Sequence, residues 1–421
     1  MIEIVNKTVL KNGVKILTQK MPYAQSVSMG VWVNVGARDE NEEENGISHF
    51  IEHMIFKGTK KRSAFQIAKE FDSIGGQTNA FTAMEQTCYY AKVLSEHIEI
   101  MADILSDVFL NSVFDPREIE RELQVVLQEI GLIEDSPEDY IHVLSNNNFW
   151  GNNSLGRTVV GSRENVIKFD SNMIKSFFKN SYHPEKIYIS VAGDIDHNKL
   201  VDLVAPLFEK IENKRPLVEK NTPNGLYKIS INPRELEQIH LCLDTLGMSA
   251  NDPRRYEYSL MNTILGGNMS SRLFQEIREI RGLAYTVCSY CASFSDTGVF
   301  GVYMGCDPEK VHESISVVLN EVDKLRKVSV SEEELNSAKQ YTKASIKLSS
   351  ESSDAQMSKL AQNEINFGRY IPIDEVIQNF ESVTIDNIYN IAQLLFKPNE
   401  LALTILGPIS SESSFESLIY R

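Results

Sequence analysis

The pattern of apolar and polar positions occurs twice along the chain. A hairpin-like opening at NGVKI (12–16) leads to the strand pattern QSVSMGVWV (25–33). In the second half, NGLYK (224–228) leads in the same way and at the same spacing to EQIHLCLDT (237–245). Alternating apolar and polar residues indicate half-buried strands, whereas the longer stretches between them have the 3.6-residue period of amphipathic helices. The chain therefore contains one unit of about 210 residues twice.

Both halves also end alike. YHPEKIYISVAGDI (182–195) and FKPNELALTILGPI (396–409) each place an apolar strand between a proline and a glycine that are nine residues apart. Strands mixed with long helices in this order predict an α+β fold of two structurally similar repeated halves, each a largely antiparallel sheet with helices packed on one face. The predicted domains are residues 1–215 and 226–421, and the polar segment 216–225 is predicted to link them.

Composition and charge narrow the class of protein. The 421 residues are 42% hydrophobic and 24% charged, which is typical of a globular protein, and the formal net charge is −16. This acidity argues against a nucleic-acid partner, which needs a basic face. It either favours basic peptide substrates or only keeps the protein soluble. No segment has the pattern of a signal peptide or of a membrane-spanning helix, so we expect a cytoplasmic protein without membrane insertion.

Five scattered cysteines suit a reducing compartment. Cys288 and Cys291 form one C-x-x-C pair, but a second pair that would complete a four-cysteine metal site is missing from the sequence. The residues around them have the pattern of a strand. We therefore expect buried thiols in a strand rather than a functional pair.

The most specific chemical signal is the pentad HFIEH. A helix is expected over 47–57 that ends at Gly58, and steps of about 100° place His49, Glu52 and His53 on one face. The other positions are apolar, namely Ile47, Phe50, Ile51, Met54, Ile55 and Phe56. Such a helix is buried, and its imidazoles and carboxylate need partners, which a metal ion provides. Chance would produce about 0.02 such pentads in a chain of this composition. The alternative is a buried histidine pair that neighbouring side chains satisfy.

Two histidine ligands require a third protein ligand, and zinc is the metal that suits them best. The run 114–135 is predicted to carry a helix, with Asp115 as its N-cap and Pro116 as its first residue. Glu122 and Glu129, two turns apart, lie at the edge of the apolar stripe of this helix. Spacing alone leaves both as candidates, beside the alternative of ordinary surface glutamates. Glu52, which is next to a ligand, can take a proton from water.

The second half of the chain lacks this polar triad. When the two strand openings are aligned, Met261, Ile264 and Leu265 stand at the equivalent positions, on a helix expected over 259–269. The repeated scaffold therefore folds without the triad, and the pentad is chemistry added to it.

The runs GISHFIEHMIFKGT, GGQTNAFT and ERELQVVLQEIGLIEDSPEDY together resemble the pitrilysin/insulinase family of zinc peptidases, in particular its small, processing-peptidase-like members. The resemblance covers essentially the whole chain. It implies that Glu129, 76 positions after His53, is the third ligand of one Zn²⁺ per chain. It also implies that Glu122 supports a ligand histidine and that Glu52 is the general base.

The same resemblance indicates substrate contacts in both halves. Asn79, Ala80 and Thr82 are expected on an edge strand beside the zinc, where an extended peptide can add through backbone pairing. Arg278 and Tyr285, in SSRLFQEIREIRGLAYTV, match a substrate-clamping pair of the family. Arg278 can bind a peptide carbonyl or carboxylate, and Tyr285 can donate to the oxyanion. The alternatives are an ordinary strand start and two surface arginines, Arg278 and Arg281, at a helix end.

The expected function is that of a zinc-dependent metalloendopeptidase that hydrolyses unfolded peptides or N-terminal extensions inside a clamshell chamber. Because the zinc residues and the arginine–tyrosine pair lie in different halves, we expect a homodimer whose active site is completed within one chain or across two. Two alternatives remain: a non-catalytic structural or regulatory subunit of a processing-peptidase-like complex, and a metal-binding scaffold without turnover. The intact pentad argues against the first.

Overall fold

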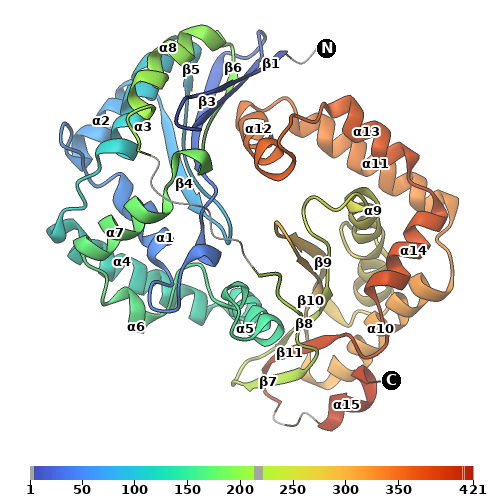
Figure 1. Ribbon diagram of the computed structural model, residues 1–421. Helices are drawn as coiled ribbons and strands as arrows, with labels where there is room; N and C mark the ends of the chain where they lie inside the picture. Colours follow the sequence, from blue (N-terminus) through green and yellow to red (C-terminus); the bar gives the residue numbers. More distant parts are fainter. Residues whose placement is uncertain (1–3, 213–220, 410, 412, 421) are drawn as a thin grey trace. The chain divides into compact units, whose positions relative to one another are not determined.

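The computed structural model describes residues 4–212, 221–409, 411 and 413–420, which form two compact units (Figure 1). The first unit contains residues 4–132, 157–212 and 348–372. The second contains residues 133–156, 221–347 and 373–409, with 411 and 413–420. The predicted linker, 216–225, lies partly outside the described residues.

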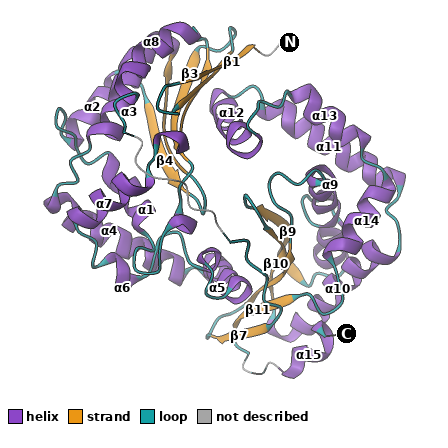
Figure 2. Cartoon of the chain, in the orientation of Figure 1, coloured by secondary structure: helices purple, strands orange, loops and turns teal. Residues whose placement is uncertain are grey.

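Within the described residues, the first unit contains a six-stranded sheet with the order β1-β2-β6-β3-β5-β4 (Figure 2). Neighbouring strands of this sheet are antiparallel except β2 and β6, which are parallel. The strands are β1 (Ile4–Val9), β2 (Lys15–Lys20), β3 (Ser26–Val33), β4 (Gln77–Thr82), β5 (Thr87–Leu94) and β6 (Ile187–Gly193).

The described part of the second unit forms a five-stranded sheet with the order β7-β11-β8-β10-β9. Its strands are β7 (Ile229–Pro233), β8 (Ile239–Leu246), β9 (Ala284–Ser293), β10 (Gly298–Cys306) and β11 (Ala402–Gly407). The pair β7 and β11 is parallel and the other pairs are antiparallel. The predicted α+β fold with two largely antiparallel sheets is confirmed.

Helices pack on the sheets and against one another. Those of the first unit are α1 (Ile47–Ile55), α2 (Ala64–Ser73), α3 (Ile98–Asn111), most of α4 (Pro116–Asp135), α6 (Arg163–Val166), α7 (Ser171–Ser181), α8 (His197–Phe208) and α12 (Ser353–Phe367). Those of the second are α5 (Pro137–Trp150), α9 (Arg255–Leu265), α10 (Val311–Lys327), most of α11 (Glu332–Ser349), α13 (Ile373–Ser382), α14 (Ile385–Leu395) and α15 (Ser413–Ile419). Among the described residues, no helix combines the length and the apolarity that crossing a membrane requires.

The two halves repeat the same order of elements, as predicted. The strand β3 corresponds to β8 and β6 corresponds to β11, at nearly the same offset along the chain. Both closing glycines, Gly193 and Gly407, have a positive φ, of 148° and 154°. The helix predicted over 259–269 is α9, which begins earlier than expected, at Arg255, and ends at Leu265. Gly266 is the C-cap residue of α9, with a φ of −155°, and an added Cβ there would lie 2.5 Å from the backbone nitrogen of Ser289, so this position requires glycine.

Two helices are exchanged between the units: each one packs in the unit that is formed mainly by the other half of the sequence. α12, from the second half, packs on β2, β3 and β6 of the first unit (Figure 1). The Trp32 indole donates to Met357 Sδ at 3.1 Å, and the hydroxyl oxygens of Ser28 and Ser353 are 2.8 Å apart. Ser28 and Trp32 lie on one face of β3, and Val27 lies on the other, because side chains alternate along a strand. α12 therefore packs on the face that carries Ser28 and Trp32. The sequence predicted helices on one face and did not foresee this one.

The counterpart is α5, from the first half, which packs on β8 and β11 of the second unit. Asn148 Nδ2 donates to Thr404 Oγ1 at 2.9 Å, and Ser145 donates to the buried carboxylate of Asp244. The starts of α5 and α12 are separated by nearly the same offset as the paired strands, so the two helices occupy equivalent places in the repeat. The compact units therefore differ from the continuous domains 1–215 and 226–421 by the exchange of two equivalent helices.

The C-x-x-C pair lies on β9, as predicted, and both thiols are free and partly buried. Cys288 packs with the cluster that contains Ile141 of α5, and Cys291 packs against the core that contains Leu265 of α9. Residues three apart on a strand point to opposite faces, so the two thiols cannot act as a pair.

Candidate metal centre

Gly46 and the carboxylate of Glu40 fix the start of helix α1, which carries the pentad. Gly46 has a φ of 100°, and a Cβ there would lie 2.7 Å from Gly161 Cα, so only glycine fits. The buried Glu40 carboxylate accepts the backbone N–H groups of Gly46 and Ser48, each at 2.8 Å. Burial raises the pKa of Glu40 to about 7. The sequence did not indicate Glu40, because it is one of several acids in the run ARDENEEENG.

His49 and His53 project from the same face of α1, as the spacing predicts. Their ring centroids are 4.7 Å apart, His49 is buried and His53 is half-buried. The apolar side chains Phe50, Ile51 and Met54 of the same helix are buried in the first unit. The helix therefore holds both imidazoles rigidly beside one another.

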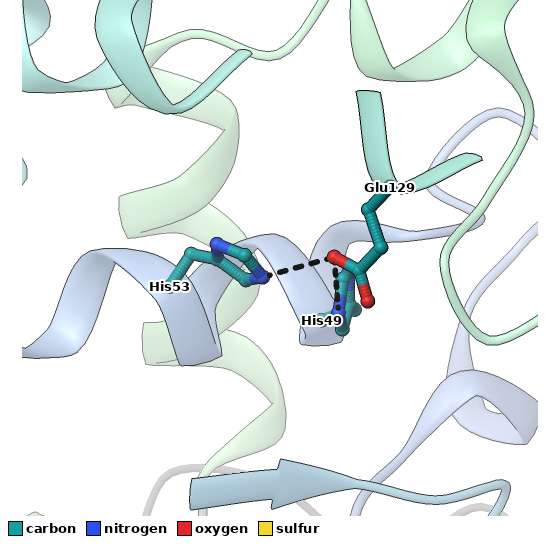
Figure 3. Close-up of side chains that lie close together, drawn as sticks. All are labelled: His49, His53 and Glu129. Atoms are coloured by element: carbon teal, nitrogen blue, oxygen red, sulfur yellow. Dashed lines mark ion pairs between the residues drawn. The ribbon is translucent and has the colours of Figure 1, made fainter. Parts of the chain in front are cut away.

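Helix α4 brings Glu129 to the histidines (Figure 3). Glu129 Oε2 lies 3.5 Å from His49 Nε2 and 3.4 Å from His53 Nε2. Helical spacing alone could not choose between Glu122 and Glu129. In the structure Glu129 is the carboxylate that faces both imidazoles.

Glu122 lies two turns earlier on α4 and is buried, whereas Glu129 is half-buried. Its Oε2 accepts a hydrogen bond from His53 Nδ1 at 3.2 Å, and its Oε1 lies 2.5 Å from the Nζ of Lys57. A proton on Nδ1 leaves the lone pair of His53 on Nε2, which is the atom that faces Glu129. Lys57 follows α1 directly, and the sequence analysis did not single it out.

These contacts shift the pKa values of Glu129 and His53. The hydrogen bond from His49, followed by that from His53, holds the pKa of Glu129 well below its usual range, although burial opposes the shift. Burial lowers the pKa of His53, but hydrogen bonds to Glu129 and Glu122 outweigh burial, so this pKa is raised. The Glu129 carboxylate therefore stays ionised, and its negative charge beside the two imidazoles favours a cation.

The three side chains fit a zinc ion. One donor atom from each of His49, His53 and Glu129 lies within 4.8 Å of the other two. Two ligands that are about 2.0–2.1 Å from a tetrahedral ion lie roughly 3.3 Å apart. The observed separations of 3.4 and 3.5 Å are close to that value. Two imidazoles and a carboxylate are also the donor set of catalytic zinc sites that keep one position open.

Glu52 lies on α1 between the two histidines and is half-buried. Thr82 Oγ1 donates a hydrogen bond to Glu52 Oε2 at 2.7 Å. Within the described residues, Glu52 Oε1 has no hydrogen bond to protein. The sequence analysis proposed Thr82 only as a substrate contact and missed its bond to Glu52, because strand and helix meet here through tertiary packing.

Asn79, Ala80 and Thr82 lie on β4, which is the edge strand of the first sheet, next to β5. α1 contacts β4, so this edge lies beside the helix of the pentad. Asn79 is exposed and Ala80 is half-buried. The predicted edge strand is therefore present and accessible.

Arg278 and Tyr285 lie in the second unit and contact each other. Arg278 belongs to a π-helical segment, Phe274–Ile280, and Tyr285 lies near the start of β9. The guanidinium of Arg278 lies 4.4 Å from the centroid of the Tyr285 ring, and its Nη1 donates to the Tyr285 carbonyl at 3.3 Å. Tyr285 is 74% exposed, so its hydroxyl is available to a ligand.

Comparison with known proteins identifies the family. The chain matches the model of the insulinase family, peptidase family M16, over residues 15–163, and that of the peptidase M16 inactive domain over residues 168–341. It is 38% identical to the uncharacterized zinc protease YmxG of Bacillus subtilis, over 96% of this chain and 98% of the relative. An uncharacterized zinc protease of Rickettsia felis is 39% identical over 96% of this chain and 97% of its own length.

The chain belongs to peptidase family M16. The resemblance to the pitrilysin/insulinase family is thereby confirmed. His49, Glu52, His53, Glu122 and Glu129 all lie in the segment that matches the first M16 model. The second half, which lacks the polar triad, matches the model described as inactive.

Two solved structures share the fold. A protease from Helicobacter pylori has a TM-score of 0.90 at 21% identity and covers 97% of this chain and 100% of its own. A protein from Pseudomonas fluorescens, described as a peptidase M16 inactive domain, has a TM-score of 0.90 at 18% identity, over 97% of this chain and 99% of its own.

Proposed function

We propose that this M16 family member is a zinc-dependent metalloendopeptidase. The observation that supports this most is the joint geometry of α1 and α4: two imidazoles and the Glu129 carboxylate converge, and Glu52 lies on the same helix, held by Thr82. The relatives named zinc proteases, from Bacillus subtilis and Streptomyces coelicolor, agree with this proposal.

His49, His53 and Glu129 would hold one Zn²⁺ per chain, with Glu122 fixing the ring of His53. When bound, zinc would acidify a water molecule and polarise the scissile carbonyl. Glu52 accepts the proton of the attacking water at Oε1, since Oε2 already accepts the hydroxyl of Thr82. Glu52 then returns this proton to the leaving amine.

The substrate is an extended peptide that pairs with the edge of β4. Alternate residues of an edge strand turn their backbone groups outward. Ala80 is one of them, because its N–H donates to Asn79 Oδ1 at 2.9 Å rather than to β5. Backbone pairing there reads conformation more than sequence, so many sequences bind but only unfolded segments fit. Unfolded peptides and N-terminal extensions of proteins satisfy this requirement. β4 adjoins Glu52 through Thr82, so a peptide on this edge lies close to the general base.

Tyr285 and Arg278 supply the remaining groups in this proposal. The exposed Tyr285 hydroxyl donates to the oxyanion that forms at the scissile carbonyl. Arg278 orients Tyr285 by stacking and donates to the substrate backbone. Either the same chain or a second copy contributes this pair, and we propose a homodimer as the active form.

The test is hydrolysis of an unfolded peptide by the zinc-loaded parent and by Glu52→Gln. The expected result is that the variant binds one zinc per chain but loses turnover. A variant that binds zinc and cleaves as fast as the parent would refute the role of Glu52. A parent that binds zinc without cleaving any unfolded peptide would instead favour the alternatives of a non-catalytic subunit or a metal-binding scaffold.

A further inference from the structure

Lys57 lies just beyond the end of the pentad helix, and its ammonium group contacts the carboxylate that supports His53. Its Nζ lies 2.5 Å from Glu122 Oε1. The other oxygen of the same carboxylate, Oε2, accepts a hydrogen bond from His53 Nδ1 at 3.2 Å. Lys57, Glu122 and His53 therefore form one line of contacts, which ends at the His53 nitrogen that faces Glu129.

The two oxygens of Glu122 have different partners. The side chain is only 8% exposed, and a buried carboxylate needs partners for its oxygens. Within the described residues, Lys57 meets Oε1 and His53 meets Oε2. Without Lys57, Oε1 would stay buried without a partner, or the carboxylate would turn away from His53 to reach water. The ammonium group therefore fixes which oxygen faces the imidazole.

The backbone of Lys57 is held on both sides. Its N–H donates to the carbonyl of Met54 at 3.0 Å, at the end of α1. The next residue, Gly58, has a φ of 127°, and its carbonyl accepts the N–H of Val113 at 3.2 Å. Val113 shortly precedes α4, the helix that carries Glu122. The side chain of Lys57 thus starts from an ordered backbone, which reduces the entropy lost when the ion pair forms.

Stability of the fold is a weak reason for this ion pair. Burying an ion pair stabilises a protein little, because the cost of removing both charges from water offsets their attraction. Orientation of the histidine is a stronger reason. The ring of a ligand histidine is held by the group that accepts a hydrogen bond from its second nitrogen, and that group needs support of its own.

We propose that Lys57 is a positioning residue of the metal centre. It holds the Glu122 carboxylate so that Oε2 stays on His53 Nδ1, and this keeps the lone pair of His53 Nε2 directed toward Glu129 and the metal. The inference rests on the zinc site of the proposed function and does not require that a peptide is hydrolysed.

The sign of the change in zinc affinity separates this role from a purely electrostatic one. A positive charge near the site repels a zinc ion, so a lysine that acted through its charge alone would weaken zinc binding. Its removal would then raise the affinity. A lysine that holds Glu122 in place strengthens zinc binding instead, and its removal lowers the affinity.

The test is the zinc affinity of the metal-free full-length protein, measured by competition with a chelator at fixed pH and without substrate. Lys57→Met removes the ammonium group and keeps the apolar part of the side chain. Lys57→Arg keeps a charged donor for Glu122. The matched control is Lys60→Met, which removes an exposed lysine of the same loop that forms no ion pair with Glu122 in the described part of the chain.

We expect Lys57→Met to lower the zinc affinity by about tenfold, the lower end of the range for partners of ligand histidines. Lys57→Arg should restore most of the affinity, and Lys60→Met should equal the parent. An unchanged or raised affinity of Lys57→Met would overturn the proposal. An equal loss in Lys60→Met would also overturn it, since the effect would then not depend on the contact with Glu122.

A double-mutant cycle with Glu122→Gln shows whether Lys57 acts through Glu122. If it does, Lys57→Met causes no further loss of zinc affinity in the Glu122→Gln protein. A further tenfold loss there would contradict the proposal, because Lys57 would then act by another route. The double variant carries neither charge of the pair, so it also provides the test if Lys57→Met alone does not fold.

The outcomes also separate this inference from the proposed function. A parent protein that binds no zinc overturns the metal site and the role of Lys57 together. In a parent that binds zinc, an unchanged affinity of Lys57→Met overturns only the role of Lys57. A parent that binds zinc without cleaving peptides contradicts only the peptidase activity, and the measured affinities still decide whether Lys57 positions Glu122.

Discussion

The hydroxyl of Thr82, on edge strand β4, donates a 2.7 Å hydrogen bond to Glu52 Oε2, on helix α1. This bond joins the strand proposed to bind the peptide to the residue proposed to move the proton. It also occupies one oxygen of the carboxylate, which leaves Oε1 to accept a proton. Thr82 is therefore a positioning residue for Glu52 in the proposed reaction.

Replacement of Thr82 by valine keeps the shape of the side chain and removes the hydrogen bond. We expect kcat to fall by about tenfold with KM and zinc affinity nearly unchanged, because a misplaced general base affects the transition state only. Thr82→Ser keeps the hydroxyl and should restore most of kcat. If Thr82→Val raises KM and leaves kcat unchanged, Thr82 is only a substrate contact.

Glu122 should control metal affinity without being a ligand. Glu122→Gln keeps an acceptor for His53 Nδ1, but it removes the negative charge and leaves Lys57 unpaired. We expect zinc affinity to fall by about 10–100-fold, as for other partners of ligand histidines. Competition with a chelator at fixed pH measures this change.

The matched control is Glu118→Gln, which lies one turn earlier on α4 and pairs with Arg121 on the protein surface. Its zinc affinity should equal that of the parent. Equal affinities of Glu122→Gln and the parent would show that the contact with His53 does not support the metal.

Glu40 should make the stability of the metal-free protein depend on pH. Burial raises its pKa from 4.5 to about 7, so between these values the folded protein holds a proton that the unfolded chain has released. The free energy of unfolding therefore falls as pH rises through this window, by up to about 3 kcal/mol from Glu40. Glu40→Gln removes this contribution.

Urea unfolding of the parent and Glu40→Gln at several pH values between 4.5 and 7 measures the effect. The free energy of unfolding of Glu40→Gln minus that of the parent should rise steadily from pH 4.5 to pH 7, whatever its value at pH 4.5. The exposed Glu99→Gln serves as control and should show a constant difference. A constant difference for Glu40→Gln as well would contradict the assignment.

Tyr285→Phe keeps the ring that stacks on Arg278 and removes the hydroxyl. Loss of an oxyanion donor should lower kcat by roughly 10²-fold and leave zinc affinity unchanged. A kcat equal to that of the parent would exclude Tyr285 from the reaction. If the site is completed across a dimer, mixing Tyr285→Phe with Glu52→Gln restores about one quarter of the activity, since half of the dimers are mixed and each has one intact site.

Local patterns in the sequence predicted the features that follow from spacing along one element. The pentad faces one side of α1, Glu122 and Glu129 lie on one side of α4, and the repeat of about 210 residues is present. Spacing alone could not choose between the two glutamates, because the choice depends on how two helices meet. The family resemblance pointed to Glu129, and in the structure that carboxylate is the one that faces both histidines.

Features that depend on contacts between distant segments were not predicted. The hydrogen bond from Thr82 to Glu52 and the capping of α1 by Glu40 arise from tertiary packing, and no periodicity signals them. The exchange of α5 and α12 was missed for the same reason. The buried face of each helix mixes polar and apolar residues, and the sequence of the helix does not say which of the two similar sheets it covers.

The central claim is that one zinc ion held by His49, His53 and Glu129 makes this chain a peptidase, and zinc titration of the metal-free protein tests it most directly. Hydrolysis of an unfolded peptide is measured as zinc is added. We predict that the metal-free protein is inactive, that the rate rises linearly and reaches its maximum at one zinc per chain, and that Glu129→Gln needs much more zinc. Turnover by the metal-free protein, or a Glu129→Gln titration identical to that of the parent, would contradict the account.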